Sequence, residues 1–96
     1  MAYYKAPPED NLLVTYYRRS GDAMSSRQAF IQALSLTTRE ADVLYWITEG
    51  KQNPEIAQIL NISLFTVQKH VANILKKTHL ENRSALTVAA LKLRTR

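Results

Sequence analysis

A helical pattern between residues 63 and 78 separates an apolar side from a side of mixed polar character. The apolar residues recur at the spacing of one buried helix face and are Val67, Val71, Ile74 and Leu75. The opposite face carries Phe65, Gln68, Lys69, Ala72, Asn73 and Lys76. Amide and ammonium groups in such a row can hydrogen-bond to base edges in the DNA major groove. The alternative is a solvated face without a partner.

The elements before this segment must set its position. Thr37 and Glu40 stand at the spacing of a capping box, in which each side chain satisfies a backbone N–H at a helix start. The apolar stripe of the helix that they begin consists of Val43, Leu44 and Ile47, with Trp46 beside it. Gly50 fits the C-terminal end of that helix, where glycine adopts a left-handed conformation at low cost. Tyr45 and Trp46 are expected to pack rather than to stack on bases.

A second and a third helix follow closely. Asn53 is predicted to cap the second helix and Pro54 to occupy its first position, where no backbone N–H is needed. Its apolar residues are Ile56, Ala57, Ile59 and Leu60. Asn61 tolerates the left-handed conformation that ends a helix, and Ser63 is predicted to cap the third helix. A short helix, a tight turn and a longer helix with a polar outer face form the helix-turn-helix layout, which many all-α domains contain.

A fourth helix is predicted to start after Asn82 and to run to about Leu93. Its stripe comprises Leu86, Ala89, Ala90 and Leu93, whereas Val88 and Leu91 lie off the stripe. The sequence therefore predicts an all-α four-helix bundle at residues 35–96. Residues 1–34 are predicted to form an N-terminal extension or linker, with a short strand at residues 12–17 and a short helix at residues 25–34.

Positive charge is concentrated in the last third of the chain. The chain of 96 residues has a net charge of +5, and residues 63–96 carry seven basic residues and one acidic residue. A localised basic surface is typical of proteins that bind polyanions. A solvated basic face with no partner would give the same composition.

Several classes of site are disfavoured by what the sequence lacks. The chain has no Cys, so it has no disulfide framework and no thiolate metal site. No apolar run reaches the length of a membrane span, and no signal-peptide pattern is present, so a cytoplasmic location without a membrane partner is expected. His70 and His79 lack acidic partners, and there is no Gly-rich phosphate loop. We expect no enzyme activity, no metal and no cofactor, and His70 is expected to be structural.

The residues in this framework resemble a known family. The runs LTTREADVL, EGKQNPEIAQIL, ISLFTVQKHVANILKKT and ENRSAL look like the DNA-binding domain of LuxR-type regulators, which include the FixJ and NarL response regulators. The resemblance covers residues 35–93. It implies a four-helix domain, similar to winged-helix proteins but without a wing, that binds double-stranded DNA as a dimer in a bacterial transcription regulator.

The resemblance also implies roles for particular residues. The positions implied to contact bases are Gln68, Lys69 and Ala72, with Asn73 as a weaker candidate. Phosphate contacts are implied or expected at Asn53, Ser63, Thr66, Lys76 and Lys77. Val88 and Leu91 lie on the helix that forms the dimer contact in the family, so they are the expected homodimer interface. Packing of these two residues on the N-terminal extension is the alternative.

The chain departs from the family at the end of the third helix. Thr78 and His79 stand where Leu and Gly are common, which weakens the signal for the helix end, and Pro54 replaces a common Lys. A competing function also remains open, since a helix-turn-helix module can contact the transcription machinery, such as RNA polymerase, instead of DNA. The basic and amide groups on the third helix favour DNA.

Overall fold

The computed structural model describes residues 21–94, which contain five α-helices and no strand. The helices are α2 (Gly21–Leu34), α3 (Thr38–Thr48), α4 (Asn53–Leu60), α5 (Leu64–Thr78) and α6 (Arg83–Arg94). The predicted all-α fold is confirmed. The short helix predicted at residues 25–34 is present and starts earlier, at Gly21. The strand predicted at residues 12–17 lies outside the described residues.

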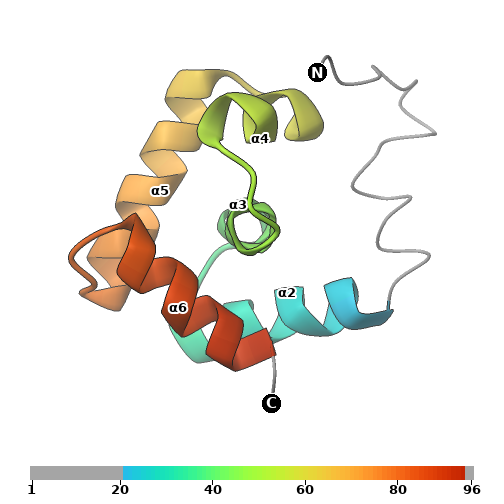
Figure 1. The fold of residues 1–96 in the computed structure, drawn as a ribbon, viewed down its shortest axis with the longest axis vertical. Helices are drawn as coiled ribbons and strands as arrows, with labels where there is room; N and C mark the ends of the chain where they lie inside the picture. Colours follow the sequence, from blue (N-terminus) through green and yellow to red (C-terminus); the bar gives the residue numbers. More distant parts are fainter. Residues whose placement is uncertain (1–20, 95–96) are drawn as a thin grey trace.

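The helix α3 forms the centre of the fold. Figure 1 looks along its axis and shows the other four helices arranged around it. All its residues from Glu40 to Ile47 are buried. Tyr45 and Trp46 are among them, with ring centroids 5.3 Å apart in an edge-on arrangement, so both pack in the core as predicted. A helix that is covered on every side serves as the scaffold for the helices around it.

The helix α2 belongs to the same core. It packs against α3 and α6, and its Phe30 is completely buried. Arg27 on α2 forms an ion pair with Asp42 on α3, with the two groups 2.8 Å apart. The division of the chain into an extension and a domain at residue 35 stays a prediction, but α2 shares its apolar core with the four helices that follow.

The capping signals of α3 act as predicted. Glu40 N donates to Thr37 Oγ1, and Thr37 N donates to Glu40 Oε1 at 3.0 Å, which completes the capping box. At the other end, Gly50 has a φ of +84°, and the N–H groups of Gly50 and Lys51 donate to carbonyls of the last turn. This pattern is the Schellman motif, which requires a left-handed residue at the position of Gly50.

The predicted cap of α4 is wrong by one residue. Gln52 is the N-cap, and Asn53 is the first residue of the helix. The backbone N–H of Gln52 donates to the carboxylate of Glu55 at 2.9 Å, so Glu55 is the acidic residue of the capping box, three residues after the cap. The side chain of Asn53 instead accepts a hydrogen bond from Arg83 on α6. Asn53 is therefore the first residue of the helix, and its side chain contacts α6 instead of capping α4.

The turn between α4 and α5 is as short as predicted. Asn61 has a φ of 56° in the left-handed region, and Ile62 N donates back to Ala57 O at 3.0 Å. Ser63 then caps α5, since its hydroxyl accepts from Thr66 N at 3.0 Å. The core side of α5 consists of Val67, Val71 and Ile74, with Leu75 partly buried. The turn and this apolar side together fix the rotation of α5 about its own axis.

The helix α6 closes the bundle. Asn82 Oδ1 accepts from Ala85 N at 2.9 Å at its start, and Leu86 and Ala90 are completely buried. Ala89 and Leu93 are partly buried, so the predicted stripe faces the core. None of the helices within residues 21–94 is long and apolar enough to cross a membrane.

Candidate nucleic-acid interface

The outer face of α5 presents the residues predicted to contact bases. Gln68, Lys69 and Ala72 are exposed, and Asn73 is half-buried at the edge of the same face. Within residues 21–94, no hydrogen bond or ion pair holds the side chains of Gln68 and Lys69. Their donors and acceptors face water, so a ligand that contacts this face does not have to break internal contacts first.

The N-terminal end of α5 is built around its cap. The hydroxyl oxygens of Ser63 and Thr66 lie 2.8 Å apart, and Ser63 Oγ also accepts from Thr66 N. Both residues lie beside the first N–H groups of α5, which have no carbonyl partner inside the helix. Such a helix start favours anions, and two hydroxyl groups add donors beside it. The arrangement fits the predicted phosphate contacts of Ser63 and Thr66.

The two lysines near the C-terminal end of α5 have different surroundings. Lys76 is exposed. Lys77 Nζ lies 2.7 Å from Glu40 Oε1 and 3.3 Å from Ser35 O. The ammonium group of Lys77 therefore joins α5 to the start of α3 and to the α2–α3 connection. Its predicted phosphate contact would have to be made in addition to this ion pair or at its expense.

Glu40 is the buried partner in this ion pair, since its side chain is only 4% exposed. Burial by itself would raise the pKa of Glu40, but the hydrogen bonds from Lys77 and Thr37 and the charge of Lys77 outweigh it and lower the pKa below its ordinary value of 4.5. The carboxylate is thus held in its charged form. Glu40 serves the capping box and the contact with α5 at the same time.

Asn53, another residue predicted to contact phosphate, also has an internal role. Its Oδ1 accepts from Arg83 Nη1, and Arg83 Nη2 donates to Lys51 O at 2.8 Å. Burial lowers the pKa of Arg83. Asn53 is half-buried, and its amide NH₂ group remains as a donor beside the start of α4. Arg83 therefore joins the start of α6 to the first residue of α4 and to the loop before it, with one hydrogen bond to each.

The residues predicted to form a dimer interface lie away from the outer face of α5. Val88 and Leu91 are 54% and 41% exposed on α6. Figure 1 shows that α6 crosses the bundle between α5 and the end of α2. The two side chains point away from the core that Leu86 and Ala90 enter. They are exposed within the described part of the chain, which leaves them open to a second copy.

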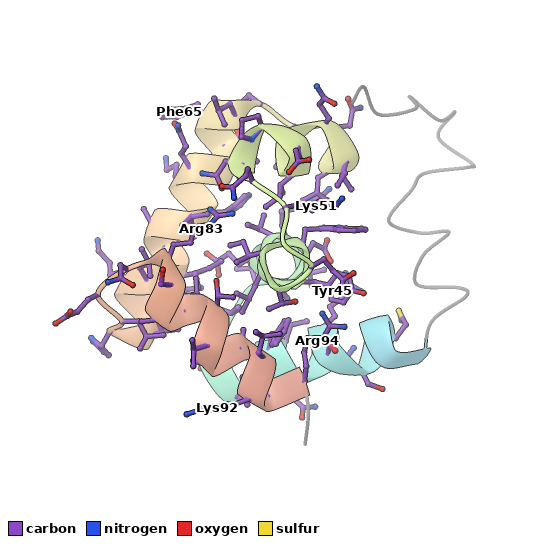
Figure 2. The ribbon with its side chains drawn as sticks, viewed as in Figure 1. Tyr45, Lys51, Phe65, Arg83, Lys92 and Arg94 are labelled. Carbon is purple, nitrogen blue, oxygen red and sulfur yellow. The ribbon has the colours of Figure 1, made fainter. Side chains whose placement is uncertain are left out.

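Long-range contacts between the helices could not be predicted from residue spacing. One such contact is made by Arg94, for which no role was predicted: its guanidinium lies 2.7 Å from the carboxylate of Glu49 and 4.8 Å from the ring centroid of Tyr45. Figure 2 shows Arg94 and Tyr45 beside each other, and Arg83 between the start of α6 and α4. Arg83 belongs to the run ENRSAL, which resembles the family, but residue spacing did not identify Asn53 as its partner. Residues 21–94 contain no group of three or more His, Asp or Glu side chains that could hold a metal ion.

Comparisons with known proteins agree with this geometry. The model of the family described as bacterial regulatory proteins, luxR family, matches residues 34–90. The nitrate/nitrite response regulator protein NarP of Escherichia coli is 44% identical over 59 residues, which are 62% of this chain and 27% of that protein. The transcriptional activator protein SolR of Ralstonia solanacearum is 50% identical over 56 residues, 58% of this chain and 24% of its own length.

A third relative is the transcriptional regulatory protein LiaR of Bacillus subtilis, 45% identical over 56 residues, which cover 58% of this chain and 26% of LiaR. The chain thus spans about a quarter of the length of these relatives. No solved structure matches the chain.

Proposed function

Because the chain belongs to the luxR family of bacterial regulatory proteins, we propose that it binds double-stranded DNA sequence-specifically as the effector domain of a transcription regulator. The observation that carries this proposal is the outer face of α5. There, Gln68, Lys69 and Ala72 form one exposed stripe on a helix whose rotation is fixed by a short turn and a buried side. An α-helix of this kind fits the major groove, and the helix before it supports its angle.

Each side chain in the stripe has a natural partner on a base edge. Gln68 can bond with its amide to N6 and N7 of adenine, and Lys69 can donate to O6 or N7 of guanine. Ala72 can pack against the C5-methyl group of thymine, and Asn73 can reach an adjacent base from the edge of the face. These contacts would supply the sequence preference of the domain.

Phosphate contacts would fix the register of α5 on the duplex. Ser63 and Thr66 lie at the helix start, and Lys76 lies at the far end of the same helix. Asn53 and Lys77 can add to this set through the N–H donors of their side chains that are not used in internal hydrogen bonds. Such contacts carry no sequence information, and their strength falls as the salt concentration rises.

Pairing of two copies through Val88 and Leu91 on α6 would make the bound form a homodimer. A two-fold dimer would present two copies of α5 to successive major grooves, and its site would then be an inverted repeat. The printed names of NarP, LiaR and SolR describe regulators of transcription. A regulator of bacterial genes acts in the cytoplasm, and contact with RNA polymerase is compatible with this role.

The direct test is selection of bound molecules from a pool of random duplex DNA at two salt concentrations, followed by sequencing. Enrichment of a palindromic motif that is lost in Gln68→Ala and Lys69→Ala would support base contacts by α5. A matched control is Gln28→Ala, since Gln28 is exposed on α2. Binding without any enriched motif would leave only the electrostatic contribution, and absence of binding would favour a protein partner.

The dimer is tested separately by sedimentation of the chain alone and on the selected DNA. Val88→Glu should abolish any dimer, because it places a charge in the proposed apolar contact. A monomer at all concentrations, also on DNA, would exclude the α6 interface.

A further inference from the structure

Phe65 has an unusual position for a large apolar side chain. It is 70% exposed and is the most exposed of the large hydrophobic residues in the described part of the chain. It is the second residue of α5 and lies in the first turn of the helix. Figure 2 shows it on the outside of the ribbon at this end of α5, away from the core. Leaving a ring of this size in water contributes nothing to the stability of the fold.

The helical register places Phe65 in line with the proposed base-contacting residues. Lys69 follows it by four positions and Ala72 by seven, so the three side chains share one stripe. Val67 and Ile74 occupy the opposite, buried side of the helix. Phe65 therefore extends the stripe by one turn toward the N-terminal end. In helix-turn-helix proteins this end of the second helix contacts base edges.

The chemistry of the ring selects its partner in the groove. A phenyl ring neither donates nor accepts a conventional hydrogen bond, so it cannot recognise the polar groups of base edges or a phosphate. The C5-methyl group of thymine is the apolar group that the major groove offers, and Phe is one of the side chains that contact it. The neighbours of Phe65 on the stripe carry an amide and an ammonium group. A surface that combines an apolar ring with amide and ammonium groups matches the DNA major groove better than it matches an apolar protein surface.

We infer that Phe65 is a further specificity-determining residue, which contacts the C5-methyl group of a thymine in the major groove. This inference rests on the proposed function. It assigns one more base position to α5, beyond the positions contacted by Gln68, Lys69 and Ala72. The contact selects thymine over cytosine at that position through the methyl group alone.

The test removes the methyl group from the DNA and, separately, the ring from the protein. Each thymine of the selected site is replaced in turn by deoxyuridine, which lacks the C5-methyl group and keeps the pairing. For the unchanged protein, we expect about a fourfold loss of affinity at the thymine that Phe65 contacts, the value for burying one methyl-sized group. Phe65→Ala should bind the thymine and deoxyuridine forms of that position equally well.

Two controls keep the result specific. Ala72→Gly should lose its sensitivity at a different thymine, and Met24→Ala, an exposed apolar residue on α2, should change nothing. The circular dichroism spectrum and the melting temperature of Phe65→Ala should match those of the unchanged protein, because the ring is exposed.

The outcomes separate this inference from the proposed function. If the unchanged protein selects no motif, the proposed function fails. If it selects a motif and Phe65→Ala retains the same sensitivity to deoxyuridine at every position, the inference alone is overturned. In that case Phe65→Ala weakens binding of the thymine and deoxyuridine forms by the same factor, if at all, and the ring does not recognise the methyl group.

Discussion

Lys76 and Lys77 are neighbours on α5 with the same charge, yet they belong to different sides of the helix. Both lysines are exposed, but Lys76 continues the outer stripe, whereas Lys77 bonds to the buried carboxylate of Glu40 and to the α2–α3 connection. The outer side of α5 is available to a ligand, and its inner side and C-terminal end are held by the scaffold. Two neighbouring residues of the same type therefore have different surroundings, because the helix directs them to different sides of α5.

The largest expected effect comes from breaking the inner contact. Lys77→Ala leaves the carboxylate of Glu40 buried without its cation, so we expect a loss of about 2 kcal/mol in the free energy of unfolding, below the value for a fully buried pair because Lys77 reaches solvent. The measurement is urea denaturation at pH 7. Lys76→Ala is the matched control and should leave stability unchanged while weakening DNA binding. Equal stability of the two variants would contradict the distinction between the two sides.

Acid should remove part of the same difference. Because the pKa of Glu40 is lower in the folded protein than its ordinary value of 4.5, its ion pair stabilises the fold fully above that value. The stabilisation is lost as the pH falls through the lowered pKa of the folded state. The gap in unfolding free energy between the unchanged protein and Lys77→Ala should therefore narrow as the pH is lowered from 7 to 3. A gap that stays constant over this range would show that the charge of Glu40 is not involved.

A smaller effect is expected at Arg83, which uses two nitrogen atoms to bond Asn53 and Lys51. Lysine has a single nitrogen in place of the planar guanidinium fork and does not reproduce its geometry toward the two acceptors, so Arg83→Lys should lower the free energy of unfolding by about 1 kcal/mol. The exposed neighbour Ser84 gives a control, since Ser84→Ala should be neutral. Thermal unfolding of both variants measures the difference, and a neutral Arg83→Lys would mean that one hydrogen bond is enough.

The smallest expected effect is an increase in stability. His79 ends α5 in the left-handed region with a φ of 60°, at the position where the family commonly has Gly. We expect His79→Gly to stabilise the fold by about 0.5 kcal/mol, because glycine removes the strain but costs more chain entropy. Asn61→Gly, at the equivalent end of α4, should gain less because Asn tolerates this conformation. Destabilisation by His79→Gly in thermal unfolding would reveal a contact of the imidazole.

Local contacts account for the parts of the fold that the sequence predicted. The Thr37–Glu40 box, the left-handed Asn61 and the Ser63 cap each involve residues within one turn of one another, so their spacing is visible in the sequence. The polar outer face of α5 follows from the period of its apolar residues in the same way.

Contacts between distant residues account for what was missed. Lys77 and Glu40 are 37 positions apart, and Arg83 and Asn53 are 30 apart. Spacing carries no information about such pairs, because the tertiary fold brings them together. The error at the start of α4 is different, because the cap there is a local pair, Gln52 and Glu55, whose three-residue spacing is visible in the sequence.

The buried Phe30 has a consequence for how the chain opens. Local fraying of α2 would expose this ring and break the ion pair between Arg27 and Asp42, so α2 cannot melt independently at low cost. The backbone amides around Phe30 should then exchange with deuterium at rates close to those of α3, as one cooperative unit. Much faster exchange in α2 would identify it as a separate segment that docks reversibly on the bundle.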